Sequence, residues 1–184
     1  MKKIILDPAQ STRLINHGPV VLVTSGIERP NIFSAAWNMP VAREGDSALV
    51  ALAINPDHYS YSLIKEYGQF AFNVPGKELL PAVIICGSTS GRKVDKFEKT
   101  GLTHVKAHKI DVPLIDECLG HLECTLEHEV RLGDHVLLIG RVVAASVNEE
   151  IFDGCWIFEK IENRTIHHLG AEYFCYPEKR ITAG

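Results

Sequence analysis

Hydroxyl groups, a glycine and cations gather in one short stretch of the sequence, residues 88–96. Its members are, in order, Ser88, Thr89, Ser90, Gly91, Arg92, Lys93 and Lys96. Backbone N–H groups at a helix start, the helix dipole and Arg or Lys side chains all favour an anion, so the stretch is typical of a phosphate site. A solvated helix start has a similar composition. The residues alone therefore leave both interpretations open.

A second candidate site is the stretch NIFSAAWNMP, residues 31–40, which carries small residues where a core strand would carry Val or Ile. Ser34, Ala35 and Ala36 would let a flat ligand lie directly on the backbone, whose N–H groups could bond its polar edge. Trp37 could then form a wall of the pocket. The alternative is a Trp37 that belongs to the core and alanines that fill a tight barrel corner, and composition alone favours this alternative.

His135 is a third candidate, because it stands at the start of a strand just past the turn of GDHVLLIGRV, residues 133–142. A lone His in such a place is usually a polar residue at a sheet edge, so its role depends on what surrounds it. The sequence has no G-x-S-x-G, Walker or H-E-x-x-H motif. We therefore predict no catalytic acid, base or nucleophile.

Two groups of residues of metal-binding type do not predict a metal site. Cys118, His121 and Cys124 are spaced three apart, but a strand over these residues puts His121 on the opposite face from the two cysteines. His167 and His168 are neighbours on an extended chain, so they point apart. The sequence predicts no bound metal ion.

The composition is that of a single globular domain over residues 1–184. Hydrophobic residues make up 46% and charged residues 23% of the chain, which excludes the disordered and fibrous classes. The net charge of −4 argues against nucleic acid as a partner. The start MKKIILDPAQ has too few apolar residues for a signal peptide, and no run approaches the length of a membrane span. The five scattered cysteines suit reduced thiols, so we expect a cytoplasmic protein without a membrane segment.

The first half of the chain alternates strands with short helices. Three apolar runs closed by turn residues predict strands, at residues 19–26, 47–54 and 69–74. Asp57 is the expected N-cap of a helix of about ten residues, which Gly68 ends. Residues 76–86 predict a second helix, in which Pro81 indicates a break or a late start.

A hairpin is predicted from residue 120 onward. The segment GHLECTLEHEV alternates between one face with Leu122, Cys124, Leu126, His128 and Val130 and another with His121, Glu123, Thr125, Glu127 and Glu129. This is the pattern of a half-solvated antiparallel strand. RLGDHV then makes a tight turn, HVLLIGRVVAASV returns, and GCWIFEKI at 154–161 adds one more strand. Six or seven strands in hairpin-like succession, with helices between the middle ones, predict a mainly β fold, a β-barrel with inserted helices.

Taken in order, these segments resemble the flavin reductase-like, FMN-binding split-barrel family, and within it the flavoredoxin group. The resemblance rests on PVVLVTS and NIFSAAWNMP, VALAI and HYSYSLI, FAFNVPGKELL, SGRKVDKFEKTGLT, HLECTLEHEV, GDHVLLIGRV and the terminal HHLG. Each motif is loose by itself, and their order and spacing give the resemblance its specificity. It implies a Greek-key split barrel that forms homodimers and holds FMN near the subunit interface.

Carried onto this chain, the resemblance implies a cofactor site built from three segments. Residues 31–38 would run along the isoalloxazine, and residues 54–61 would add contacts at the end of a strand and the start of a helix. Residues 88–96 would neutralise the phosphate. The implied FMN-binding residues are Asn31, Ser34, Ala35, Ala36, Trp37, Asn38, Ile54, Tyr59, Ser60, Tyr61, Ser88, Ser90, Arg92 and Lys96. The implied substrate contacts are His135, because the GDH turn borders the nicotinamide in reductases of the family, and His168 in the C-terminal tail.

Three activities are compatible with this resemblance. The first is an NAD(P)H-dependent flavin reductase that passes a hydride to flavin N5, a reaction that needs ring positioning and fixed donors near N1. The second is an electron carrier of the flavoredoxin type, whose tightly held FMN takes electrons from a redox protein partner. The third is a split-barrel module that has lost the flavin. We expect the reductase, while the sequence does not choose between NADH, NADPH and a protein donor.

Overall fold

The computed structural model describes residues 11–12, 14–15, 18–44 and 47–183. The strands are β1 (Val21–Ser25), β2 (Asn31–Ala35), β3 (Asn38–Glu44), β4 (Ser47–Ile54), β5 (Gln69–Val74), β6 (His104–Val105), β7 (Leu114–Ile115), β8 (Gly120–Leu132), β9 (His135–Val147), β10 (His167–Gly170) and β11 (Tyr173–Cys175). The helices are α1 (Tyr59–Tyr67), α2 (Leu80–Ser88) and α3 (Lys96–Thr100), with 3₁₀ turns η2 (Lys77–Leu79), η3 (Glu149–Ile151) and η4 (Ile161–Asn163). Within these ranges, no helix has the length and apolar character needed to cross a membrane.

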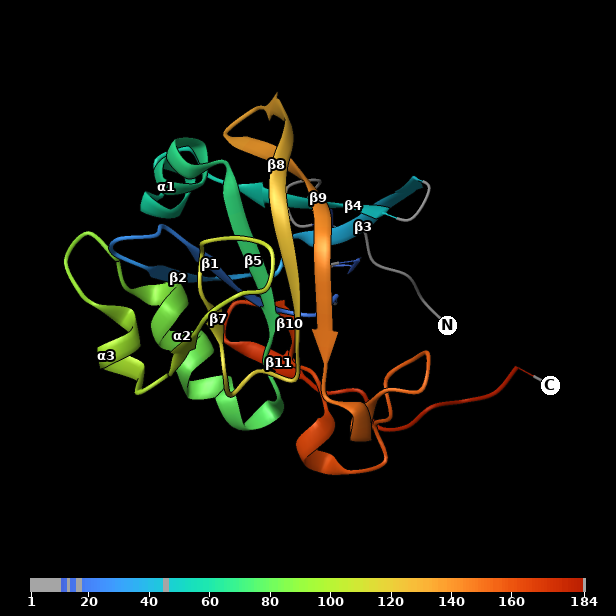
Figure 1. Ribbon diagram of the computed structural model, residues 1–184. Helices are drawn as coiled ribbons and strands as arrows, with labels where there is room; N and C mark the ends of the chain where they lie inside the picture. Colours follow the sequence, from blue (N-terminus) through green and yellow to red (C-terminus); the bar gives the residue numbers. More distant parts are fainter. Residues whose placement is uncertain (1–10, 13, 16–17, 45–46, 184) are drawn as a thin grey trace.

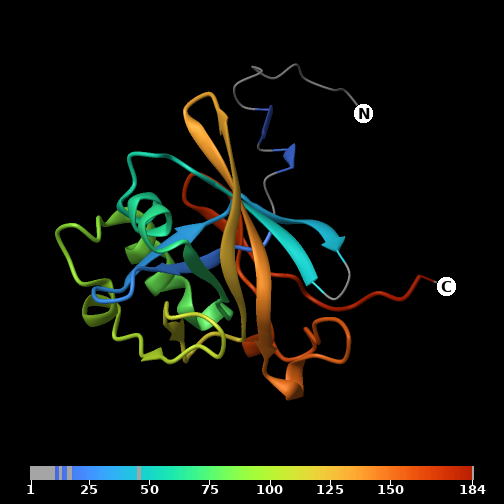
Figure 2. The same cartoon turned by 45° about the horizontal axis from the view of Figure 1, so that its top comes forward.

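Seven of the strands form one antiparallel sheet in the order β2-β1-β5-β8-β9-β4-β3. The strands at its two edges, β2 and β3, are consecutive in the chain and are joined only by Ala36 and Trp37. Such a short link requires the sheet to curl until its edges meet, as Figures 1 and 2 show. A backbone hydrogen bond from Ala53 N to Trp37 O, 3.0 Å long, lies at this closure. The structure therefore confirms the predicted barrel with inserted helices.

The barrel interior is filled by apolar side chains from its different strands. Val23, Leu52, Phe70 and Leu138 are all fully buried there. Gly140 makes room for Phe70, since a methyl group on this glycine would come within 2.4 Å of the Phe70 ring. The barrel therefore has a packed core, and a ligand can reach the strands only at its rim and outer face.

The hairpin of β8 and β9 departs from the predicted alternation of faces. Its pairing shifts by one residue on each side of the segment Cys124–Leu126. Because a bulge adds one residue to one strand, the side chains beyond it change face, and Val130 is 46% exposed. Glu123 is buried because the loop before β7 covers it, and its carboxylate accepts the N–H groups of His108 at 2.9 Å and Lys109 at 2.6 Å. The prediction of one apolar and one solvated face is therefore wrong at both ends of this strand.

Helix α1 begins one residue later than its predicted start. The residue at the N-cap position is His58, so the assignment of Asp57 as N-cap is wrong. Asp57 N donates instead to Asn55 Oδ1 at 2.9 Å, in a local turn that competes with capping. Gly68 ends the helix as predicted, with a left-handed φ of 64°.

Two other predicted segments have different outcomes. Helix α2 follows a 3₁₀ turn and carries Pro81 in its first turn, which confirms the late start. The strand predicted at residues 154–161 does not form. Gly154 turns the chain at φ 98°, and only an isolated bridge joins Phe152 to Trp156, so the segment makes a turn instead.

Helices α2 and α3 lie together on one side of the barrel, over β2 (Figure 1). Their apolar faces meet in a second core that includes Ile32, Val83, Phe97 and Ile166. Ile166 comes from the C-terminal part of the chain, and its carbonyl accepts Val20 N at 2.7 Å just before β1. The helices and the C-terminal segment around β10 and β11 therefore share one core with β2 and with the start of β1.

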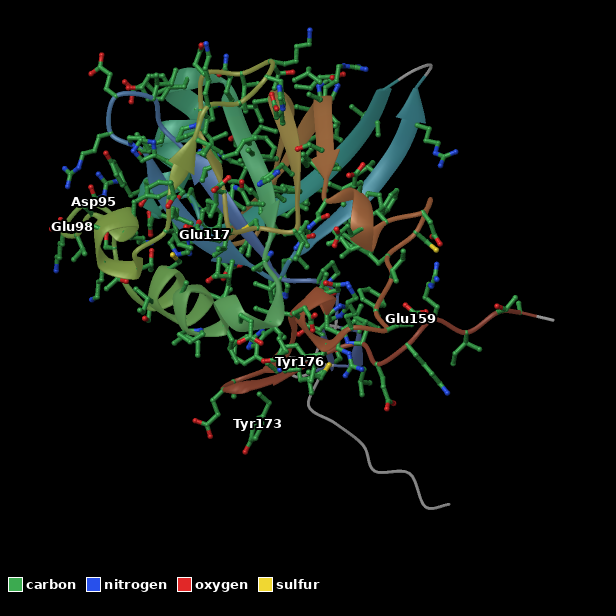
Figure 3. All side chains as sticks on the ribbon, turned by 60° about the horizontal axis from the view of Figure 1, so that its bottom comes forward. Asp95, Glu98, Glu117, Glu159, Tyr173 and Tyr176 are labelled. Atoms are coloured by element: carbon green, nitrogen blue, oxygen red, sulfur yellow. The ribbon has the colours of Figure 1, made fainter. Side chains whose placement is uncertain are left out.

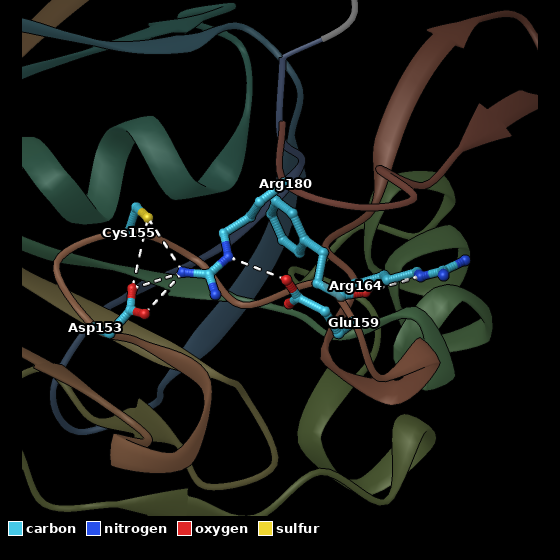
Figure 4. Close-up of polar contacts among 6 residues, drawn as sticks. Asp153, Cys155, Glu159, Arg164 and Arg180 are labelled. Atoms are coloured by element: carbon cyan, nitrogen blue, oxygen red, sulfur yellow. Dashed lines mark hydrogen bonds and ion pairs between the residues drawn. The ribbon is translucent and has the colours of Figure 1, made fainter. Parts of the chain in front are cut away.

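The chain after β11 is held by ion pairs of Arg180. Its Nη1 donates to both carboxylate oxygens of Asp153 at 2.8 Å, and its Nε donates to Glu159 at 3.2 Å (Figure 4). All of these groups are largely exposed, so the pairs fix the direction of the tail more than they stabilise the fold.

Candidate functional site

Two adjoining pockets open where the end of β2, the start of α1 and the loop after α2 meet. The wide pocket encloses about 450 Å³. The narrow pocket encloses about 260 Å³. Because both are lined by Phe33, Ser34 and His58, they form one bent groove.

Two glycines leave the space for the narrow pocket. A methyl group on Gly91 would overlap the Asn31 Oδ1 atom. A methyl group on Gly87 would lie 2.5 Å from Ser34 Oγ. Any larger residue at either position would therefore push side chains of β2 out of place or fill the groove.

Lys96 is the main charge of the narrow pocket. Its residue is only 3% exposed, and its Nζ donates to the carbonyls of Ile32 at 2.7 Å and Cys86 at 2.8 Å. Asp95, the N-cap of α3, and Glu98 are both exposed on the outer side of that helix (Figure 3) and pair with no buried cation. Burial lowers the pKa of Lys96. Asp57 also lines the narrow pocket, but it forms no ion pair with Lys96. Among the described residues no carboxylate pairs with this cation, so its ammonium group favours an anionic ligand.

The narrow pocket also has an unpaired acceptor and unpaired donors that a polar ligand could satisfy. Asn31 Nδ2 donates to Ser60 Oγ at 2.7 Å, whereas its buried Oδ1 has no hydrogen-bond partner. Helix α1 starts at Tyr59 with no side-chain cap, and its first residues line the pocket. Tyr61 N donates to the carbonyl of His58 at 3.1 Å, which leaves the N–H groups of Tyr59 and Ser60 at the partly positive start of the helix for a ligand. Together with Lys96 they form a site that can bind a phosphate and a hydroxyl group.

The wide pocket is bordered by an aromatic wall. The rings of Trp37 and His135 lie 5.1 Å apart and are tilted by 43°. His135 Nδ1 lies 2.9 Å from Asp134 Oδ1, and this hydrogen bond lowers the pKa of Asp134. On the other side, His168 Nε2 donates to the carbonyl of Ala171 at 3.0 Å. Between these walls the pocket has small residues on its floor and can accept a flat ring.

The structure brings most of the predicted residues to this groove. The wide pocket is lined by Ser34, Ala35, Ala36, Trp37, Ile54, His135 and His168. The narrow pocket is lined by Asn31, Ser34, Tyr59, Ser60, Ser88, Ser90 and Lys96. Their roles toward a ligand stay predictions, but their common location agrees with one site.

Three predicted residues lie beside the groove and do not line either pocket. Tyr61 Oη donates to Glu129 on β8 at 2.8 Å. Asn38 Nδ2 donates to two backbone carbonyls at 2.9 and 3.1 Å. The Arg92 guanidinium lies over the Tyr59 ring, 4.9 Å from its centre. These side chains brace the strands and the helix start that form the site.

Sequence reasoning missed His58, Phe33 and the glycine at position 87. Gly87 directly follows the predicted helix of residues 76–86 and lies inside the observed α2, where a glycine is unfavourable, so a longer predicted helix would have indicated a close approach there. His58 carried no such signal, because only the closure of the barrel places the start of α1 beside β2. No three His, Cys, Asp or Glu side chains of the described ranges are placed to share a metal ion.

The sequence matches the model of the "Flavin reductase like domain" family over residues 13–165. The chain belongs to this family. It is 38% identical to the protein YddH of Escherichia coli K12, over 98% of each chain. Its fold is similar to that of flavoredoxin from Desulfovibrio vulgaris (Miyazaki F), with a TM-score of 0.85, 23% identity and coverage of 100% and 97% of the two chains. It is also similar to an FMN-binding protein from Thermus thermophilus, with a TM-score of 0.83, 24% identity and coverage of 100% and 99%.

Proposed function

We propose that this protein binds FMN in the bent groove and acts as an NAD(P)H-dependent flavin reductase. The observation that carries the proposal is the buried, uncompensated Lys96 at one end of a groove whose other end is lined by small and aromatic residues. Family membership and the FMN-binding protein with the same fold support the choice of cofactor.

The groups in the narrow pocket fit the phosphate end of FMN. Lys96 supplies one charged donor, the uncapped start of α1 supplies backbone N–H groups, and Ser90 adds a hydroxyl. The Ser88 hydroxyl lines the same pocket but donates to the carbonyl of Ile84 at 2.8 Å, so it would have to turn to reach a ligand. The orphaned Asn31 Oδ1 needs a donor, and the ribityl hydroxyls of FMN are donors of this kind. The ligand would therefore satisfy both the unpaired cation and the unpaired acceptor.

The wide pocket then takes the ring. Ala35 and Ala36 let the ring approach the backbone, and Trp37 with His135 leaves a partly exposed wall where a nicotinamide can lie against it. FMN, when bound, supplies the hydride acceptor. The protein itself would hold the two rings in contact and exclude water from one face, and the reaction needs no acid or base from the chain.

An electron carrier of the flavoredoxin type is the second candidate. The similarity to flavoredoxin over the whole chain favours it. In that case the exposed ring edge beside Trp37 would meet a redox protein, and no nicotinamide would bind.

One anaerobic titration separates these candidates. The protein is loaded with FMN, passed over a desalting column, and titrated with NADH, NADPH and dithionite while the flavin absorption band is followed. Bleaching by either nicotinamide supports the reductase. Retained flavin that bleaches only with dithionite supports the carrier, and failure to retain flavin would contradict both.

We also propose that the protein is a cytoplasmic homodimer. An apolar groove of about 580 Å³ beside β3, with Trp37 46% and Met39 55% exposed at its edge, is suited to cover by a second copy. The cysteines of the described ranges are all free, which suits a reducing compartment. Sedimentation equilibrium tests this proposal. The wild type should have the mass of a dimer, and Met39→Glu should have that of a monomer because it places a charge in the apolar interface.

A further inference from the structure

His58 stands at the bend of the groove. Of the titratable side chains in the described ranges, it is the one that lines both the wide and the narrow pocket. Its backbone is extended just before the first turn of α1, and its ring meets Phe33 edge-on at 6.5 Å between centroids. The proposed hydride transfer assigns it no role.

The surroundings of His58 favour a neutral ring in the ligand-free pocket. Partial burial lowers its pKa, and His135 on β9 and Lys96 on α3 lower it further, while the neighbouring Asp57 acts in the opposite direction. His135 and His168 each have one ring nitrogen engaged by the protein. Within the part of the chain that the structure describes, neither nitrogen of His58 has a hydrogen-bond partner. His58 is therefore free to exchange a proton in response to a ligand.

The next step rests on the proposed function. In FMN the ribityl phosphate chain leaves the ring at N10, which is adjacent to the N1 edge. If the phosphate occupies the narrow pocket and the ring the wide one, this edge lies near the bend and near His58. Transfer of a hydride leaves one negative charge on the reduced ring, spread over N1 and the neighbouring carbonyl. The new charge would arise on the side of the ring that faces the imidazole.

We propose that the imidazole of His58 takes up one proton from solvent each time the bound flavin ring accepts two electrons. The donor delivers two electrons and one proton to the ring, which gains one negative charge. A second proton moves from bulk water to a ring nitrogen of His58, which gains one positive charge. When the ring is reoxidised, both protons return to solvent. The site would thereby keep its net charge constant through the redox cycle.

The test is the midpoint potential of the FMN-loaded protein between about pH 6.5 and about pH 8, where a histidine with a shifted pKa changes charge. Uptake of two protons with two electrons makes the potential fall by about 59 mV per pH unit, whereas one proton gives about 30 mV. We expect the steeper slope for the wild type and the shallower slope for His58→Gln. His108→Gln is the matched control, because His108 is exposed and lines neither pocket. It should keep the wild-type slope.

A second variant, His58→Arg, keeps a permanent positive charge at the bend. It should show the shallow slope with a more positive potential than His58→Gln at every pH. A wild-type slope of about 30 mV per pH unit, or equal slopes in wild type and His58→Gln, would overturn the proposal. Before the titration, the visible spectrum shows whether the wild type has kept its flavin on the desalting column. Loss of the flavin would contradict the proposed function, and not only the role of His58.

Discussion

Replacing Lys96 with Met should weaken the binding of FMN and leave the binding of riboflavin nearly unchanged. The ammonium group of Lys96 donates two of its three N–H groups to the carbonyls of Ile32 and Cys86, at 2.7 and 2.8 Å. The third is then the charge-assisted donor available to a phosphate. A hydrogen bond of this kind contributes about 1.5–3 kcal/mol. The dissociation constant of FMN should therefore rise by about 10-fold to about 150-fold.

The assay is flavin fluorescence quenching, titrated separately with FMN and with riboflavin, which lacks the phosphate. Lys93→Met is the matched control, since Lys93 lies in the turn that leads into α3, three residues before Lys96, but is exposed and outside both pockets. It should keep both dissociation constants within about twofold. Circular dichroism checks that each variant is folded. An unchanged FMN affinity in Lys96→Met, or an equal loss for riboflavin, would refute the assignment of the narrow pocket to the phosphate.

Four other predictions follow from the same geometry. Gly91→Ala should abolish retention of FMN on desalting, because its methyl group would overlap Asn31 Oδ1 and close the narrow pocket; a variant that keeps its flavin would contradict this. His135→Ala should raise the KM for the nicotinamide by about tenfold, the loss of about one hydrogen bond, while the flavin stays bound; an unaltered KM would remove this residue from the substrate site. Cys155 is exposed, whereas burial raises the pKa values of the buried thiols, so Cys155→Ser should remove the fastest phase of reaction with a disulfide reagent in the native protein. Finally, burial lowers the pKa of Lys96 in the ligand-free folded state below its ordinary value of 10.5. Between the lowered pKa and 10.5, the folded protein therefore binds fewer protons than the unfolded chain. Its free energy of unfolding should rise as the pH rises through that window. Calorimetry without ligand should therefore show the Tm of the wild type rising relative to that of Lys96→Met toward pH 10.5, and a falling difference would contradict the burial of this charge.

Local sequence patterns predicted elements whose signals are local. Gly68 ends α1 because a left-handed residue is needed there, and Pro81 delays α2 because it lacks an N–H. The alternation in β8 predicted a strand correctly, but it did not predict the two bulges, since the pairing partner decides where an extra residue is inserted. Residues 154–161 have the composition of a strand but make a turn around Gly154 with no neighbouring strand to pair with.

For the candidate site too, the sequence shows some features and only the structure shows the others. The small residues of 34–36 and the cations of 92–96 are visible in the sequence as types of chemistry, and the resemblance to a family arranges them into one site. From the sequence alone, Arg92 and Lys96 are equally good candidates for the cation that binds the phosphate. Only the folded chain separates them, because Arg92 stacks on Tyr59 at the surface while Lys96 is buried at the pocket.

By itself, then, the sequence determined the mainly β class, the family and the segments that carry polar and small residues, because these depend on residue type and order. The tertiary structure decided which side chains share a cavity. A two-residue link between the edge strands curls the sheet into a barrel, and this closure brings the start of α1, with His58, against β2. Burial without a carboxylate partner then makes Lys96 an anion-binding group, and burial is a property of packing that no stretch of sequence contains.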